Sequence, residues 1–318
     1  MTRPTIGLDI GGTNLRAAVV DRDGVVLTHR REVSAGAWEP MRGHILEVIA
    51  ALRAEHDVAA VGIGAAGLVD RDGVIRYAPN VPGFLNTPVR SEIEEAIGLP
   101  TIVENDANAA AWGELTHGAA RGADDALIIT LGTGVGGGIV SGGRLLRGAN
   151  SFGGEIGHFT VDVDGPMCAC GEPGHWEALA SGTALGRMAR DAAAAGTAPA
   201  VLAAAAGRVD AVTGIHVSDA ARHGAPDALA LVTRYAEYVA LGLIGLANIL
   251  DPEIVVVSGG LIAEGEMLLG PVRSSFADRI EGTAYRPTPP IVVAELGDTA
   301  GTVGAAMIAR SLVQGSGA

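Results

Sequence analysis

A cluster of carboxylate and amide side chains lies at Glu104–Asn108, between an apolar run and a helical pattern. The run Thr101–Val103 is expected to form a strand. A helix is expected to start at Asn105 or Asp106 and to end at His117. An aspartate at a helix start is most often a cap, but four polar residues in five positions exceed what capping needs. A carboxylate here can accept the proton of a substrate hydroxyl, so Asp106 is a candidate general base.

Two glycine-rich turns have the composition of phosphate-binding loops. The first is Asp9-Ile10-Gly11-Gly12-Thr13-Asn14, and the second is Leu131-Gly132-Thr133-Gly134-Val135-Gly136-Gly137-Gly138, with five glycines in the seven positions from Gly132. Glycine lets backbone N–H groups close on an anion, and the threonine hydroxyls add donors. Asp9 would hold Mg²⁺ through water, since hard cations prefer oxygen ligands. Each turn alone could be an ordinary hairpin, but together they predict two loops that grip one polyphosphate.

Phosphate binding in this chain must work without lysine, because all 22 basic residues are arginine. This excludes a Walker A loop and a Schiff-base lysine. Backbone amides, hydroxyls and Mg²⁺ must then carry phosphate binding. A third turn, Ser258-Gly259-Gly260, is a candidate contact to the base or ribose. The residues expected to contact the nucleotide are Asp9, Gly11, Gly12, Thr13, Asn14, Gly132, Thr133, Gly134, Gly259 and Gly260.

Two histidines and two cysteines lie within 18 residues: His158, Cys168, Cys170 and His175. Thiolate and imidazole suit tetrahedral Zn²⁺, although the Cys-x-Cys spacing is tighter than that of the usual zinc finger. The alternative is two free thiols and two surface histidines. The glycines and proline between the candidate ligands favour a metal-bound knuckle, because this stretch has little apolar content to order it.

The elements that must position these residues are those of an α/β protein. Strands are expected at Thr5–Ile10, Leu15–Val20, Val25–Val33, Val58–Ala66, Ala126–Leu131, Gly136–Ser141, Ile254–Val257 and Ile291–Ala294. Helices are expected at Trp38–His56, Ser91–Ile97 and Thr299–Val313, and Ser181–Leu250 is expected to be mostly helical. A strand, a Gly/Thr turn and a returning strand occur near the start of each half, which indicates two similar lobes. We expect a small α/β lobe at 1–118 with about 299–318, and a large α/β lobe with the zinc knuckle at 119–298.

The composition excludes several classes of protein. The chain has 318 residues and a net charge of −14, so it repels nucleic acid and anionic membranes, and we expect neither as a partner. Cys168 and Cys170 are too close for a good mutual disulfide, so a reducing, cytoplasmic location is expected. No signal peptide is expected at the N-terminus. No membrane span is expected either, because Glu237 and Asn248 interrupt the most apolar region, Tyr235–Leu250, which is expected to be a buried helix.

Taken together, these segments resemble the ROK family (repressors, open reading frames and kinases), and within it the bacterial glucokinase-like sugar kinases. The most specific parts are GGEIGH, CACGEPGHWE and ENDANAA, which match in order and spacing. The resemblance implies a two-lobed actin-like ATPase/hexokinase fold with the active cleft between the lobes. It implies that Asp106 is the catalytic base and that His158, Cys168 and Cys170 bind zinc. The sugar contacts that it implies are Asn80, Asn105, Asp106, Glu155, His158 and Glu177.

The activity that the resemblance implies is transfer of phosphate from ATP, with Mg²⁺, to the 6-hydroxyl of a hexose, with glucose as the first choice. The alternatives are mannose, N-acetylglucosamine or N-acetylmannosamine as the substrate, polyphosphate as the donor, or a non-catalytic sugar-sensing protein of the family. Repressors of the family carry a helix-turn-helix ahead of the body, for which the strand from Thr5 leaves no room. The resemblance favours a homodimer or homotetramer. Where the family usually has a third cysteine this chain has His175, so a structural Cys₂His₂ zinc site is expected.

Overall fold

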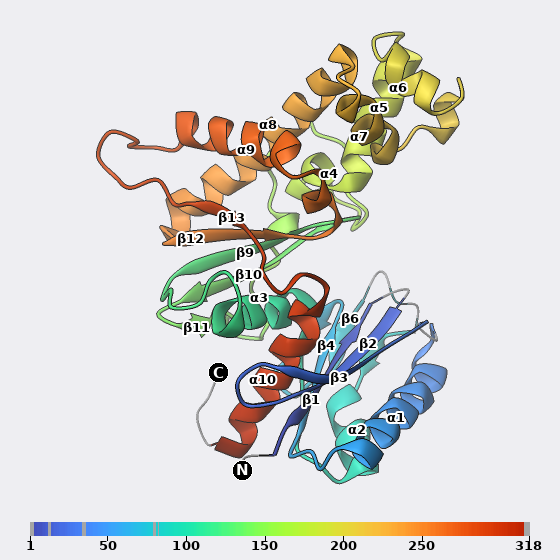
Figure 1. Cartoon of the computed structure of the whole chain (residues 1–318), viewed down its shortest axis with the longest axis vertical. Helices are drawn as coiled ribbons and strands as arrows, with labels where there is room; N and C mark the ends of the chain where they lie inside the picture. The colour runs from blue at the N-terminus through green and yellow to red at the C-terminus, as the bar shows by residue number, and fades with distance from the viewer. Residues whose placement is uncertain (1–2, 12–13, 34–35, 79–80, 82, 315–318) are drawn as a thin grey trace. The chain divides into compact units, whose positions relative to one another are not determined.

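The computed structural model describes residues 3–11, 14–33, 36–78, 81 and 83–314 (Figure 1). The chain divides into two compact units. Unit 1 comprises Met1–Ile129, Gly137–Gly154 and Ala294–Ala318, and unit 2 comprises Thr130–Gly136 and Glu155–Val293. The predicted lobes, 1–118 with about 299–318 and 119–298, remain a proposal about the functional halves of the chain.

Strands and helices alternate along the chain, which confirms the expected α/β class. The strands are β1 (Thr5–Ile10), β2 (Asn14–Val20), β3 (Val26–Val33), β4 (Val61–Ala65), β5 (Leu68–Val69), β6 (Ile75–Tyr77), β7 (Leu85–Thr87), β8 (Thr101–Asn105), β9 (Ala126–Leu131), β10 (Val135–Ser141), β11 (Arg144–Leu145), β12 (Ile254–Ser258) and β13 (Ile291–Val293). The α-helices are α1 (Trp38–Glu55), α2 (Val89–Ile97), α3 (Asp106–His117), α4 (Trp176–Ala180), α5 (Gly182–Ala194), α6 (Pro199–Ala204), α7 (Gly214–Arg222), α8 (Pro226–Leu250), α9 (Glu266–Arg279) and α10 (Ala300–Gln314). The 3₁₀ turns are η1 (Ile156–His158), η2 (Val209–Ala211), η3 (Gly260–Glu264) and η4 (Gly297–Thr299).

The first sheet of unit 1 has the order β3-β2-β1-β4-β8. Strands β1, β2 and β3 pair antiparallel, whereas β1, β4 and β8 run parallel. Alternate residues of β1 point to opposite faces. Ile6, Leu8 and Ile10 join a core with α1 and α2, whereas Gly7 lies against α10. Helices therefore cover both faces of this sheet, with α1 and α2 on one side and α10 on the other (Figure 1).

Glycines allow α10 to pack directly on its neighbours. A Cβ on Gly7 of β1 would lie 1.8 Å from the Thr302 carbonyl oxygen, and one on Gly62 of β4 would lie 1.9 Å from that of Ala305. A Cβ on Gly304 of α10 would lie 1.7 Å from the carbonyl oxygen of Ala109 in α3. No side chain fits at such separations, so glycine at these places is required by the packing rather than by a turn.

The strand order supports the internal duplication expected from the two Gly/Thr turns. The second five-stranded sheet has the order β11-β10-β9-β12-β13. In each sheet the third, second, first, fourth and fifth strands of the set follow one another, and a glycine turn joins the first strand to the second. The three short strands β5, β6 and β7, which the sequence pattern did not predict, form a small separate sheet.

Helix α8 is longer than the predicted helix Tyr235–Leu250 and forms the last part of the region Ser181–Leu250, which was expected to be mostly helical. It spans Pro226–Leu250 and is long and apolar enough to cross a membrane by length and composition, whereas the sequence predicted no such helix. Half of its most apolar window is buried, and the helix packs against α4, α5, α6, α7 and α9. These contacts are those of a core helix, as expected for Tyr235–Leu250.

Candidate active site

The turn between β8 and α3 is capped by Asn105 rather than by Asp106. The Oδ1 of Asn105 accepts the Asn108 N–H at 3.0 Å, and its Nδ2 donates to the Gly67 carbonyl at 3.2 Å. Asp106 is the first residue of α3, and its Oδ1 accepts the N–H of Ala107 at 2.9 Å. A negative charge is stabilised at this end of a helix. The capping role, the main alternative for Asp106, is therefore filled by its neighbour.

Asp9 lies near the end of β1, opposite Arg16 of β2. Nη1 of Arg16 donates to Oδ2 of Asp9 at 3.2 Å, and Nη2 of Arg16 lies 3.7 Å from the Asp298 carboxylate. Burial raises the pKa of Asp9 above its ordinary value, and the charge of Arg16 acts in the opposite direction. A divalent cation would offset the same cost of burying the carboxylate. The Asp9 carboxylate is therefore suited to bind a cation.

The predicted magnesium role of Asp9 leads to a kinetic prediction: Asp9→Asn is expected to lower kcat/KM for MgATP on the order of 10²-fold or more, because the amide lacks the negative charge that the predicted site would offer to Mg²⁺. The fold should not suffer. Because the pKa of Asp9 is raised in the folded protein, folding favours the protonated carboxyl. The stability that this protonation contributes is present at low pH and is lost as the pH rises through the raised pKa. The melting temperature of Asp9→Asn should therefore equal or exceed that of wild type at pH 7, and the difference should shrink toward pH 4.

The control for this prediction is Asp57→Asn, which removes an exposed carboxylate paired with Arg3. Its kinetics with MgATP and its melting curve should match those of wild type. A variant Asp9→Asn with wild-type kcat/KM for MgATP would show that Asp9 does not serve the metal.

The remaining part of the first loop is described at Gly11 and Asn14. The Gly11 N–H donates to the Asn14 carbonyl at 2.9 Å, and Oδ1 of Asn14 accepts from Nε of Arg31 at 3.3 Å. The predicted contacts Gly12 and Thr13 lie outside the described residues, as does the predicted sugar contact Asn80.

The second loop is held through its carbonyl groups. The N–H of Gly182, the first residue of α5, donates to the Gly132 carbonyl at 2.8 Å. The hydroxyl of Thr183 donates to the Thr133 carbonyl at 2.8 Å. Among the described residues, no acceptor is bound by the N–H groups of Thr133 and Gly134. These N–H groups and the exposed Thr133 side chain are compatible with the predicted binding of an anion.

The third loop lies beside the second. Oγ1 of Thr130, at the end of β9, is 3.1 Å from Oγ of Ser258, at the end of β12. Gly259 has a φ of 95°, and a Cβ there would lie 2.3 Å from the Leu131 carbonyl oxygen. Only glycine combines this backbone angle with this approach. The predicted contacts at 132–134 and 259–260 are thus neighbours within unit 2.

Glu177 joins the second loop to the cysteine–histidine knuckle. Its Oε2 accepts the Val135 N–H at 2.9 Å, and a Cβ on Gly134 would lie 2.2 Å from the same oxygen. Its Oε1 accepts from Sγ of Cys168 at 3.5 Å. A shift of the knuckle would therefore be transmitted to the second loop.

The other two predicted sugar contacts of unit 2 lie at the two ends of η1: Glu155 precedes it and His158 is its last residue. Nε2 of His158 lies 4.0 Å from Oε2 of Glu155. Desolvation raises the pKa of Glu155, His158 lowers it, and Glu177 raises it again. Glu155, His158 and Glu177 are therefore close enough to interact electrically. A Cβ on Gly157 would lie 2.1 Å from the Val135 carbonyl oxygen, which fixes η1 against the second loop.

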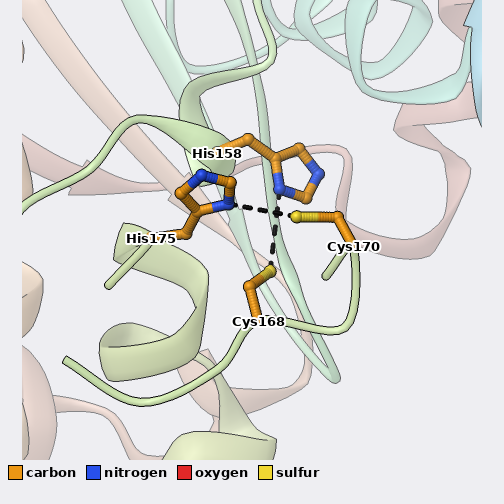
Figure 2. Close-up of side chains that lie close together, drawn as sticks. All are labelled: His158, Cys168, Cys170 and His175. Carbon is orange, nitrogen blue, oxygen red and sulfur yellow. Dashed lines mark hydrogen bonds between the residues drawn. The ribbon is translucent and has the colours of Figure 1, made fainter. Parts of the chain in front are cut away.

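Figure 2 shows the four predicted zinc ligands converging on one point, with each histidine presenting Nδ1 to a thiol. The distances are 3.8 Å from Nδ1 of His158 to Sγ of Cys168 and 3.2 Å from Nδ1 of His175 to Sγ of Cys170. All four ligand atoms lie within 4.8 Å of one another. Bonds of about 2.0–2.3 Å place the ligands of a tetrahedral zinc roughly 3.3–3.8 Å apart.

The donor set fits a structural metal site. Cys168 and His175 are buried, and Cys170 is exposed. Burial raises the pKa of the Cys168 thiol to about 11, because the charged thiolate is disfavoured away from water. A cation bound to the sulfur would stabilise the thiolate and lower this pKa. The Nδ1 of His158 faces the thiols while its Nε2 faces Glu155. One ring can therefore serve the metal and a second partner at once.

Sequence reasoning missed the residues that hold the candidate groups in place. The position of Arg16 opposite Asp9 follows from the hairpin, because residues at equal distances before and after the glycine turn face each other. Thr183 and Arg147 gave no local signal, because their partners lie far away along the chain: the Thr133 carbonyl and the Glu104 carboxylate, respectively. Glu114, which supports the fold rather than the candidate site, gave none either: it is fully buried toward the end of α3 away from Asp106, and its carboxylate accepts three backbone N–H groups, those of Ala119, Glu295 and Leu296.

The duplicated sheets, each with a glycine turn after its first strand, agree with the actin-like α/β fold expected from the sequence. The model of the ROK family matches residues 5–311. A glucokinase from Streptomyces coelicolor is 42% identical over 309 residues, covering 96% of this chain and 97% of the relative. A glucokinase from Thermotoga maritima is 38% identical over 316 residues and covers 98% of both chains.

A solved structure of a ROK family glucokinase from Streptomyces griseus, in complex with glucose and AMPPNP, has the same fold. It matches with a TM-score of 0.85 at 44% identity, covering 97% of this chain and 99% of that one. The chain belongs to the ROK family. The family resemblance and the actin-like hexokinase fold expected from the sequence are confirmed.

Proposed function

We propose that this chain is an ATP-dependent glucokinase that transfers the γ-phosphoryl group of ATP to the 6-hydroxyl of glucose. The observation that carries the proposal is the turn at the start of α3, where Asn105 caps the helix and Asp106 is not needed for that purpose. The relatives named glucokinases cover nearly the whole chain, and the relative from Streptomyces griseus binds glucose and an ATP analogue.

In the proposed reaction, Asp106 takes the proton of the sugar 6-hydroxyl as the hydroxyl oxygen attacks the γ-phosphorus, and ADP leaves. Asn105, Glu155, His158, Glu177 and, outside the described residues, Asn80 would bind the sugar hydroxyls. Asn105 and Glu177 each have groups already bound to the backbone, which fixes their orientation before the sugar arrives. Preorganised donors and acceptors lose little entropy on binding.

The nucleotide contacts are proposed from the three glycine turns. The N–H groups at Thr133 and Gly134 would bind phosphate oxygens, and Gly259 and Gly260 would border the base or ribose. Asp9, with Gly11, Gly12, Thr13 and Asn14, would hold Mg²⁺ and the terminal phosphates. Mg²⁺ supplies neutralisation of the charge on the transferring group.

The test of this function is a coupled assay of ADP release across glucose, mannose, N-acetylglucosamine and N-acetylmannosamine, with and without Mg²⁺. Glucose is expected to have the highest kcat/KM, and omission of Mg²⁺ should abolish turnover. A higher kcat/KM with another hexose would change the substrate but keep the kinase. Polyphosphate in place of ATP tests the donor in the same assay. No turnover with any sugar would refute the kinase and favour the alternative, a non-catalytic sugar-sensing protein.

We also propose one structural Zn²⁺ per chain, held by His158, Cys168, Cys170 and His175. The support is the convergence of four ligand atoms of the right chemistry, two thiols and two imidazoles. Two thiolates and two neutral imidazoles give a neutral complex without an open position. The metal would fix the ring of His158 and, through His175 at the start of α4, the position of Glu177.

Removal of the metal is expected to lower both the melting temperature and the affinity for glucose, because the knuckle positions His158 and Glu177. His175→Ala should lose or weaken the metal, whereas His175→Cys should retain it. The measurements are elemental analysis, X-ray absorption to count two sulfur neighbours, and calorimetry with glucose. His223→Ala, at an exposed helix end, is the control and should keep one zinc. A stable, active, metal-free protein would refute the zinc site.

The remaining proposals concern partners and location. The net charge of −14 supports a protein that binds neither nucleic acid nor anionic membranes. Two cysteines without a disulfide support a cytoplasmic location. The family resemblance supports a homodimer or homotetramer, which light scattering of the purified protein would test.

A further inference from the structure

Glu104 and Arg147 form an ion pair at the turn that carries Asp106. Nε of Arg147 lies 2.6 Å from Oε2 of Glu104, and the two side chains are 23% and 5% exposed. Taking a carboxylate out of water costs several kcal/mol, which only good pairing offsets. A buried pair is therefore weak evidence for added stability, and its local contacts show what else it does.

The second oxygen of Glu104 holds the residues on both sides of Asp106. Oε1 accepts the N–H of Asn105 at 3.0 Å and Nδ2 of Asn108 at 3.1 Å. Asn105 and Asn108 are in turn joined by the capping bond of α3. The Glu104 carboxylate thus holds the backbone of Asn105, just before Asp106, and the side chain of Asn108, two residues after it.

Arg147 connects this turn to the segment that leads into GGEIGH. Its carbonyl accepts the Gly153 N–H at 2.9 Å, and a Cβ on Gly153 would lie 3.0 Å from the same oxygen. The buried Oδ1 of Asn108 has no hydrogen-bond partner among the described residues and would lie 3.4 Å from a Cβ on Gly154. The glycines at 153 and 154 let this segment approach the ion pair and the turn.

We propose that Glu104 and Arg147 are positioning residues for the general base. They act through Asn105 and Asn108 to hold the Asp106 carboxylate where it meets the sugar hydroxyl. This inference rests on the proposed function of Asp106. A misplacement of about 1 Å in a catalytic group can cost 10²-fold in rate, so loss of the ion pair should appear in kcat before it appears in nucleotide binding.

The test is Glu104→Gln, with Glu114→Gln as its matched control. Glu114 is a buried carboxylate of α3 that also binds backbone N–H groups, but at the other end of the helix. Glu104→Gln should lower kcat on the order of 10–10²-fold with KM for ATP little changed. Glu114→Gln should lower the melting temperature and keep kcat. Arg147→Lys, which retains the positive charge, should lower kcat less than Glu104→Gln and provides a second variant if the first folds poorly.

The decisive comparison is Glu104→Gln in the Asp106→Ala background. If Glu104 acts only through Asp106, the double variant should turn over as fast as Asp106→Ala alone. If Glu104→Gln lowers kcat in the Asp106→Ala background by the same factor as it does in the wild-type background, the inference is overturned. Wild-type kcat in Glu104→Gln, with Asp106→Ala inactive, would overturn the inference and leave the proposed function standing. A wild-type rate in Asp106→Ala would overturn both.

Discussion

Asp106→Ala is expected to lower kcat on the order of 10²–10⁴-fold while glucose binding is largely kept. The loss follows because no other group would take the proton of the attacking hydroxyl at that position. The fold should tolerate the change, since Asn105 rather than Asp106 caps α3. The measurements are kcat by coupled ADP release and the glucose Kd by calorimetry.

Asp106→Asn separates the base from its contacts. The amide oxygen can still accept the Ala107 N–H that Asp106 binds at 2.9 Å, but the side chain is no longer basic. It should therefore be as slow as Asp106→Ala and melt at or slightly below the wild-type temperature, because it loses only the charge that this end of α3 stabilises. Turnover near the wild-type rate in either variant would show that Asp106 is not the base.

Gly132→Val is expected to raise KM for ATP strongly or to abolish activity, with glucose binding unchanged. A Cβ at Gly132 would meet no protein atom within 4 Å, so we expect the fold to accept valine, whose side chain would occupy the space beside the loop. If that space is filled by phosphate, valine excludes it. The melting temperature should stay at the wild-type value, and kinetics with varied ATP measure the effect.

The matched control is Gly43→Val on α1. Gly43 is exposed, and a Cβ there also meets nothing within 4 Å, so the same change is made without a ligand nearby. Its ATP kinetics should equal those of wild type. Unchanged ATP kinetics in Gly132→Val would remove the second loop from the proposed nucleotide site.

Local signals predicted much of the fold. Strand β1 and strand β9 begin and end where the apolar runs and glycine turns placed them, at Thr5–Ile10 and Ala126–Leu131. Helix α1 ends within one residue of its predicted end, and α3 starts at one of its two predicted residues. The convergence of the four candidate metal ligands was also predicted, because close spacing along the chain keeps them together in space.

The supports of the site could not be predicted from local sequence. The ion pair of Glu104 and Arg147 joins residues 43 positions apart, and Thr183 donates to a carbonyl 50 positions away. Such contacts depend on how strands and helices pack, which periodicity does not encode. The short strands β5, β6 and β7 have two or three residues each, too few for an alternating pattern.

Identification of the phosphorylated product is the most direct measurement of the proposed glucokinase activity. The purified protein would be incubated with MgATP, labelled at the γ-phosphoryl group with ¹⁸O, and with glucose. Mass spectrometry and ³¹P NMR would then locate the label. We predict that one labelled phosphoryl group appears on the 6-oxygen of glucose for each ADP formed, and that Asp106→Asn forms almost none. Label recovered only in inorganic phosphate or in unreacted ATP would contradict the assignment of this chain as a glucokinase.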